Sequence, residues 1–313
     1  MTNHAPKIVA LGGGHGLAAT LSSLAKLDVD ITAVVTVADD GGSSGRLRGD
    51  FDILPPGDLR MALASLCPDT TKGTSTAELL QYRFADGSSL AGHPIGNLIL
   101  TALWQLEDNP VDALTRAAEL VNARGTVLPM SNTPLSIEAT VESSTGELHR
   151  IRGQATVART IGRIRDLSIT PLDPPACPEA LAAIAQADWI ILGPGSWYTS
   201  IMPALLIREL REAMAHSSAK KLLIVNLQDE LGETEGLDPA EHIQIFGSFA
   251  GDLRLDSVLV DSSHEHLGTR IARNAAVLGA DTIFASVRCT ETRTTHNPEL
   301  LSRVLHEIVT RVR

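Results

Sequence analysis

Two adjacent aspartates and the glycine- and serine-rich run behind them are the most chemically distinctive stretch of this sequence. Asp39 and Asp40 could hold a divalent cation or a ribose hydroxyl, and a solvated turn capped by the two carboxylates is the alternative. Glycines let a backbone approach a ligand closely, while hydroxyl and guanidinium groups bind phosphate oxygens. The candidate ligand-binding residues of this stretch are Asp40, Gly41, Gly42, Ser43, Ser44 and Arg46, with Arg48 close behind.

Two glycine turns elsewhere in the chain each join a short apolar run to a helical pattern, which is the arrangement that binds phosphate at a helix start. Leu17 stands where a third glycine would complete the G-x-G-x-x-G spacing, so the pattern favours phosphate over NAD, and a plain tight turn is the alternative. The candidate residues of the first turn are Gly12, Gly13, Gly14 and Gly16, and those of the second are Gly193, Pro194, Gly195, Ser196, Tyr198, Thr199 and Ser200.

Three further polar residues stand near predicted helix starts. Asp58 is placed to cap the helix that follows Pro55 and Pro56. Arg60 lies two residues into that helix, where a cation gains nothing from the helix dipole, so a phosphate partner is expected and a surface ion pair is the alternative. His93 and Asn97 lie at the mouth of a later helix, which the stretch from Gly92 to Asn97 opens. Both could hydrogen-bond a ligand, although His93 could equally be a simple cap.

The elements that must position these residues alternate between strands and helices. Strands are expected at 7–11, 31–37, 189–192, 222–226, 257–260 and 282–285, and helices at 17–27, 77–84, 199–215 and 239–249 among others. From residue 127 the period changes to two, and 135–142 with 147–152 predicts a β-hairpin. The sequence therefore predicts one α/β domain over 1–313, with a parallel sheet flanked by helices and a β-rich insertion at about 127–171. Residues 172–178 are the most linker-like stretch.

Composition excludes several classes of function. The 313 residues contain 37 acidic and 26 basic side chains, and the net charge of −11 argues against a nucleic-acid or anionic-membrane partner. Cys67, Cys177 and Cys289 are too far apart for a metal knuckle or a disulfide framework, which favours a reducing, cytoplasmic setting. The first residues lack a signal-peptide core, and no apolar run is long enough to span a membrane.

Six motifs in order carry a resemblance to a known family. They are Gly12-Gly13-Gly14-x-Gly16-Leu17, the stretch from Thr36 to Arg48, Pro55-Pro56-Gly57-Asp58-Leu59-Arg60, Gly92-His93-x-x-Gly96-Asn97-Leu98, Gly193-Pro194-Gly195-Ser196-x-Tyr198-Thr199-Ser200 and Gly232-Glu233-Thr234-Glu235-Gly236. With these motifs the chain resembles the YvcK family, also called gluconeogenesis factor, within the superfamily named for phospholactate transferase. The motifs span roughly three quarters of the chain.

The resemblance implies a Rossmann-like fold and a UDP-sugar ligand, notably UDP-N-acetylglucosamine. It also implies a role linking carbon source to cell-wall precursor supply and cell shape, in a homo-oligomer that acts through regulatory protein partners. The transferase relatives use aspartates near Mg²⁺, and Asp39 and Asp40 hold the corresponding places, where they would be catalytic if the protein is an enzyme. Our leading hypothesis is a regulatory nucleotide-sugar-binding protein, and the alternative is a magnesium-dependent transferase of a phosphate-linked group.

Overall fold

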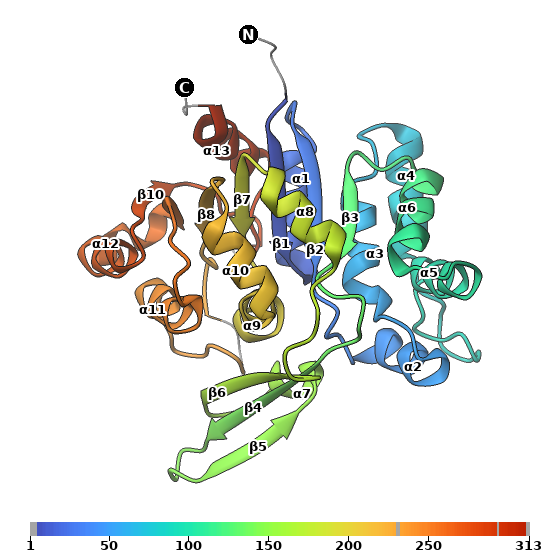
Figure 1. The fold of residues 1–313 in the computed structure, drawn as a ribbon, viewed down its shortest axis with the longest axis horizontal. Coiled ribbons are helices and arrows are strands. Elements are labelled where there is room, and N and C mark those ends of the chain that lie inside the picture. The colour runs from blue at the N-terminus through green and yellow to red at the C-terminus, as the bar shows by residue number, and fades with distance from the viewer. Residues whose placement is uncertain (1–4, 230–231, 293, 311–313) are drawn as a thin grey trace.

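The computed structural model describes residues 5–229, 232–292 and 294–310. Within these residues, seven parallel strands form one sheet in the order β10-β9-β8-β7-β1-β2-β3 (Figure 1). The strands are β1 (Lys7–Gly12), β2 (Asp30–Val35), β3 (Thr126–Pro129), β7 (Trp189–Leu192), β8 (Lys220–Ile224), β9 (Ser257–Asp261) and β10 (Asp281–Ala285). The predicted α/β class with a parallel sheet is confirmed.

Helices cover both faces of this sheet, which is why the central strands β1 and β7 are almost wholly apolar and buried. α8 and α10 lie over the face turned to the viewer in Figure 1, and α1 packs against α3 and α13. The helices of the sheet layer are α1 (Gly14–Leu24), α2 (Gly42–Phe51), α3 (Pro56–Ser65), α4 (Thr71–Gln81), α5 (Ile95–Leu106), α6 (Pro110–Val121), α8 (Pro178–Gln186), α9 (Met202–Leu206), α10 (Arg208–His216), α11 (Pro239–Ala250), α12 (Gly268–Val277) and α13 (Pro298–Thr310). No helix of the described residues is both long and apolar enough to cross a membrane.

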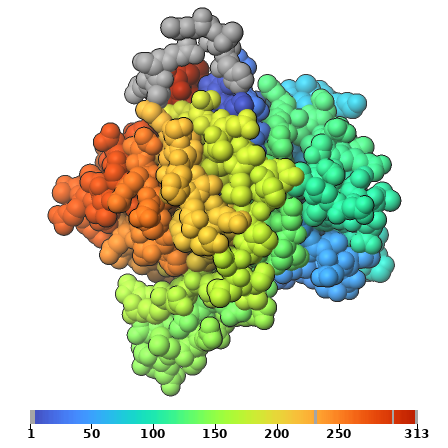
Figure 2. All heavy atoms as spheres, in the orientation of Figure 1, coloured from blue at the N-terminus to red at the C-terminus, as the bar shows by residue number. Residues whose placement is uncertain are grey.

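A small antiparallel sheet projects from the carboxyl end of the large one, as a lobe in Figures 1 and 2. It consists of β4 (Ser136–Glu142), β5 (Leu148–Arg152) and β6 (Arg163–Thr170), in the order β5-β4-β6. Buried and half-buried residues alternate along β4, so the predicted hairpin is confirmed. The β-rich segment does not begin at 127, however, because β3 pairs in parallel with β2 and belongs to the large sheet.

Two helix predictions need correction, and one short helix was missed. α4 begins at Thr71 and not near Ala77, because the Thr70 side chain accepts a hydrogen bond from the Gly73 N–H and starts the helix earlier. The helix predicted over 199–215 is divided into a π-helical turn, η1 (Trp197–Ile201), and the helices α9 and α10, with extended backbone at Ile207 between them. The four-residue helix α7 (Gln154–Val157) was not predicted, since it is too short for a periodic pattern.

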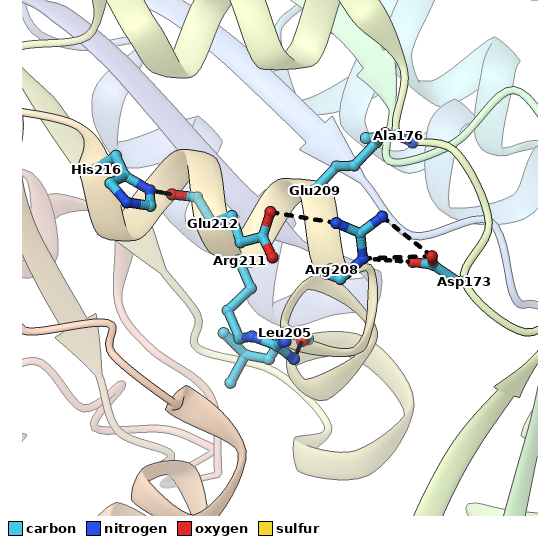
Figure 3. A network of polar contacts seen from close by, with 8 residues as sticks. All are labelled: Asp173, Ala176, Leu205, Arg208, Glu209, Arg211, Glu212 and His216. Carbon is cyan, nitrogen blue, oxygen red and sulfur yellow. Dashed lines mark hydrogen bonds and ion pairs between the residues drawn. The ribbon is translucent and has the colours of Figure 1, made fainter.

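The linker-like stretch after β6 is tied to the body of the protein (Figure 3). Arg208, the first residue of α10, forms an ion pair with Asp173 and another with Glu212 one turn further on. The Glu209 carboxylate accepts a hydrogen bond of 2.8 Å from the Ala176 N–H. The chain that leaves the small sheet is therefore anchored on the large one.

Candidate functional site

A cleft opens at the carboxyl ends of β1 and β7, where the chain connections leave the sheet in opposite directions. Such a switch point is where open α/β sheets bind ligands. The cavity has a volume of about 400 Å³. Seven of the predicted ligand-binding residues line it, namely Gly13, Gly14, Gly16, Pro194, Gly195, Ser196 and Ser200. A larger hollow of about 680 Å³ lies near Pro6, Asp188 and Lys220, at the amino ends of the strands and away from the cleft. No predicted site residue lines it.

The two glycine turns of the cleft are in direct contact. A Cβ atom on Gly16 would overlap the Pro194 carbonyl group and the Gly195 Cα atom. Gly14 has open space around it but adopts φ +59°, in the left-handed region that favours glycine. Gly12 is the last residue of β1, and Gly193 directly follows β7. Close packing therefore accounts for glycine at position 16, and backbone conformation accounts for it at position 14.

The start of α1 is the donor-rich part of the cleft. The first N–H groups of a helix have no acceptor within the helix. The Gly14 N–H donates to Asp58 Oδ1 at 3.1 Å, which leaves the His15 and Gly16 N–H groups at this helix start for a ligand. Asp58 was predicted to cap its own helix, but Pro55 occupies that position and Asp58 caps α1 instead. Desolvation, followed by the negative charge of Asp39, raises the pKa of Asp58 to about 7.

Most polar groups of the second glycine turn form hydrogen bonds within the protein. The Asn226 side chain exchanges two hydrogen bonds of 2.9 Å with the backbone of Gly195. The buried Glu233 carboxylate accepts from the Tyr198 N–H at 2.9 Å and from the Thr199 hydroxyl at 2.5 Å. The prediction that this turn offers these N–H groups to an anion is therefore wrong for Gly195 and Tyr198.

Tyr198 does not line the cleft. It lies instead in a separate hollow beside Arg163 and Glu233, and burial, with a smaller contribution from the Glu233 charge, raises the pKa of Tyr198 to about 12. Thr199 lines neither hollow. Of the hydroxyl groups predicted to face an anion, those of Ser196 and Ser200 are the ones that reach the cleft. The wide π-helical turn η1 directs neighbouring side chains to different sides, which a regular helical pattern does not indicate.

The aspartate pair lies beside the cleft and does not line it. Asp39 Oδ1 accepts from the Gly41 N–H and Asp40 Oδ1 from the Ala155 N–H, each at 2.9 Å. The glycine and serine run after the pair is not an open loop, since α2 begins at Gly42. No group of three or more His, Cys, Asp or Glu side chains is placed for a metal among the described residues. Asp39 Oδ2 packs against Gly57, the residue that precedes Asp58, and two carboxylates with ligand phosphate oxygens are a set that suits Mg²⁺.

Four other predicted site residues form a buried chain of hydrogen bonds. Arg60 Nε donates to Asn97 Oδ1 at 2.9 Å, Asn97 Nδ2 donates to Ser43 Oγ at 3.0 Å, and Ser43 Oγ lies 2.8 Å from His93 Nδ1. Ser43 Oγ accepts from Asn97, and the tautomer of the His93 ring sets which partner donates in the contact between Ser43 and His93. Burial, and then the positive charge of Arg46, lowers the pKa of His93. The structure brings these residues together, but they do not line the cleft.

Arg46 and Ser44 also have partners within the protein. Arg46 Nη2 donates to the Ala91 carbonyl oxygen at 2.8 Å, and Ser44 Oγ accepts from the Gly57 N–H at 3.0 Å. Gly57 must be glycine because a Cβ atom there would lie 2.5 Å from Asp39 Oδ2. The carboxyl ends of β1 and β2 and the starts of α2 and α3 are therefore joined into one packed polar layer next to the cleft.

Several residues that line the cleft were not predicted as ligand-binding. They are His15, Ala19, Asp58, Gln154, Asn226, Leu227, Gln228, Thr294, Thr295 and His296. Asn226 follows β8 closely, and a polar residue just after a buried strand is the signal that could have indicated it. The buried His296 ring has no hydrogen-bond partner for Nε2 in the described part of the chain, and burial lowers the pKa of His296 to about 4. Nothing in the local sequence around His296 indicates that it lines the same cavity as the start of α1.

A parallel sheet with a glycine-rich helix start at its switch point defines a Rossmann-like α/β protein with a ligand cleft. The family model described as 2-phospho-L-lactate transferase CofD matches residues 8–296, and the chain belongs to this CofD family, in the branch of the gluconeogenesis factors or YvcK family. A protein of Mycobacterium tuberculosis is 44% identical over 310 residues, covering 97% of this chain and 90% of that protein. The gluconeogenesis factor of Bacillus subtilis is 40% identical over 257 residues, covering 82% and 79%.

A solved structure shares this fold. It is that of a UPF0052 family member from Bacillus halodurans, with a TM-score of 0.86 and 32% identity. The similarity covers 97% of this chain and 99% of that one. The large and the small sheet are therefore both within a fold that a related protein adopts.

Proposed function

We propose that the protein binds a UDP-sugar, specifically UDP-N-acetylglucosamine, in the cleft between the two glycine turns, and that it acts as a cytoplasmic regulatory protein. The observation that carries this proposal is the start of α1, where His15 and Gly16 line the cavity and their N–H groups have no acceptor within the helix. The rest of the lining is mainly uncharged, and Asp58 is its one carboxyl group among the described residues. A diphosphate is the anion that a helix start with free N–H groups favours. Amide, hydroxyl and imidazole groups suit the hydroxyls of a sugar and the edge of a base.

The names of relatives support a proposal for the cellular role. Relatives are named gluconeogenesis factor, which supports a link to carbon metabolism. We propose that the ligand reports the supply of cell-wall precursor, and that the protein, as a homo-oligomer, passes this information to regulatory protein partners that influence cell shape. The net charge of −11 argues against nucleic acid as one of those partners.

Thermal unfolding with three diphosphate ligands tests the ligand. At about a hundredfold excess over Kd, a ligand that binds the folded state adds ~2.7 kcal/mol to its stability, which raises the melting temperature by several degrees. We expect this shift with UDP-N-acetylglucosamine and none with NAD, and GDP tests the transferase branch. All three carry a diphosphate, so a difference among them must come from base and sugar contacts. An equal shift with all three would contradict a UDP-sugar site.

A single substitution in the cleft tests the location. Ser200→Ala removes a hydroxyl that lines the cavity and leaves the backbone of η1 unchanged. The loss of one ligand hydrogen bond, about 1 kcal/mol, should weaken binding about fivefold in calorimetric titration. The matched control is Ser65→Ala in α3, whose hydroxyl bonds the Met61 carbonyl outside the cleft. Equal affinity in both variants would place the ligand elsewhere.

The alternative function is a magnesium-dependent transfer of a phosphate-linked group, which the description of the matching family supports. The observation that favours it is the packing of Asp39 Oδ2 against Gly57, the residue before Asp58, which brings two carboxylates to the same side of the cleft. The Asp39 charge accordingly contributes to the raised pKa of Asp58. Mg²⁺ held by Asp39 with ligand phosphate oxygens would stabilise charge on the transferring group. If this function is correct, Asp39→Asn abolishes turnover while nucleotide binding persists. Absence of wild-type turnover with every magnesium-nucleotide pair would count against it.

A further inference from the structure

The short helix α7 connects the small sheet to the cleft. Gln154, its first residue, is half-buried and lines the same cavity as the start of α1, although it belongs to the segment between β5 and β6. Figure 1 shows α7 at the side of the small sheet that faces the large one. The Gly153 N–H donates to the Ile137 carbonyl oxygen at 2.8 Å, so this turn is fixed to β4. No hydrogen bond of the Gln154 side chain is formed within the described residues.

Asp40 holds the start of α7 from the first half of the large sheet. Its Oδ1 atom accepts from the Ala155 N–H at 2.9 Å across 115 positions of sequence. α7 has no capping side chain of its own, since its N-cap residue is Gly153 at φ +101°. A Cβ atom on Gly153 would overlap Asp40 Oδ2. The Asp40 carboxylate therefore acts as the cap of α7 and packs directly against the Gly153 backbone.

The second half of the large sheet contacts the other end of α7. A Cβ atom on Gly232 would lie 2.6 Å from the carbonyl oxygen of Ala158, the residue that follows α7. The next residue, Glu233, binds Tyr198 and Thr199 of η1. α7 is thus packed between the loop after β2 and the loop after β8, which lead to the two sides of the cleft.

We propose that Gln154 contacts the bound ligand through its side-chain amide, and that Asp40 is a positioning residue that holds Gln154 in place by capping α7. This inference rests on the proposed nucleotide-sugar site for the role of Gln154, whereas the capping role of Asp40 is independent of any ligand. The small sheet is then part of the binding site. Its residues supply a contact to the sugar nucleotide that the parallel sheet alone does not provide.

Hydrogen exchange of the ligand-free protein tests the cap. Asp40→Ala removes the acceptor, so the Ala155 amide should exchange about tenfold faster than in the wild type. Asp40→Asn keeps an oxygen at the same position and should restore slow exchange. A metal-binding or catalytic aspartate would not be rescued in this way, because asparagine lacks the charge. Unchanged exchange at Ala155 in Asp40→Ala would overturn the capping role.

Ligand titration tests Gln154. Gln154→Ala should raise the Kd for UDP-N-acetylglucosamine about fivefold to tenfold, with the ligand-free melting temperature unchanged. Asp40→Ala should weaken binding to a similar extent and Asp40→Asn should not. The matched control is Gln244→Ala on α11, where the glutamine is exposed and does not line the cleft. Wild-type affinity in Gln154→Ala would overturn the contact.

The two measurements separate the failure of this inference from that of the proposed function. If the wild type binds no UDP-sugar, the proposed function and the Gln154 contact both fail, while the exchange experiment still decides the role of Asp40. If the wild type binds and Gln154→Ala binds equally well, the proposed function stands and the contact is wrong.

Discussion

At the scale of single residues, Gly16 is the position at which the two halves of the cleft meet. Gly16→Ala places a methyl group in the Pro194 carbonyl, so the turns must separate, and we expect a loss of about 3 kcal/mol in the free energy of unfolding together with loss of ligand binding. Urea unfolding measures the first and calorimetry the second.

The same substitution at Gly49 is the control. Gly49 lies in α2 with no atom within 4 Å of an added Cβ and with an ordinary φ, so alanine there should stabilise the protein by about 0.5 to 1 kcal/mol through helix propensity. Similar stability in the two variants would mean that the turns have room to move apart.

At the scale of elements, the hydrogen-bonded chain from Arg60 to His93 joins α3, α5 and α2. Asn97 is 1% exposed and Arg60 is 3% exposed, and Arg60 Nη1 has no partner among the described residues. Burial lowers the pKa of Arg60 to about 10, so the guanidinium remains charged at neutral pH. Removing the Asn97 oxygen that accepts from Nε leaves the buried Arg60 cation with one hydrogen bond fewer. Such a loss lowers the free energy of unfolding.

Asn97→Leu should therefore lower the free energy of unfolding by about 3 kcal/mol. Arg60→Met with Asn97→Leu removes both partners, and the double variant should lose clearly less stability than the sum of the single changes. Urea unfolding of the four proteins gives the coupling. Simple additivity would show that the chain does not act as a unit that holds the three helices together.

At the scale of the whole molecule, buried histidines make the stability depend on pH. His242 is 1% exposed beside Trp197, neither of its ring nitrogens has a partner in the described residues, and burial lowers its pKa from 6.5 to about 4. Between pH 6.5 and 4 the unfolded chain therefore binds a proton at this position that the folded chain does not. The stability is full above pH 6.5 and is lost as the pH falls toward 4.

His242→Phe isolates this contribution from those of His296 and Asp58. The stability of the variant relative to the wild type should rise by up to about 1.4 kcal/mol per pH unit from pH 6.5 down to pH 4. Removing two unpaired nitrogens should also leave the variant at least as stable at pH 7. The exposed His306→Phe controls for the substitution itself. A difference between wild type and His242→Phe that stays constant from pH 7 to pH 4 would contradict the burial argument.

Local patterns in the sequence determined most of the large sheet and the places of its turns. Short runs such as Ile190 to Leu192 are continuously apolar because helices cover both faces of a parallel sheet, and such runs are visible without any tertiary contact. The glycine turns after β1 and β7 and the alternating pattern of the β4–β5 hairpin are likewise local features of the sequence, and both were predicted. Periodicity reports only the apolar face of a helix. It therefore missed the first turns of α4, which begin at a polar cap, and the π-helical turn η1.

Only the tertiary structure decided which polar groups remain for a ligand. Asp58 takes the Gly14 N–H, Asn226 takes the Gly195 N–H, and Asp40 caps α7 from 115 residues away. Each of these hydrogen bonds joins segments that are distant in sequence. The sequence does not distinguish a carboxylate or amide that bonds a backbone group from one that is free to bind a ligand. The contacts are set by the packing of whole elements against one another, and the local sequence carries no record of that packing.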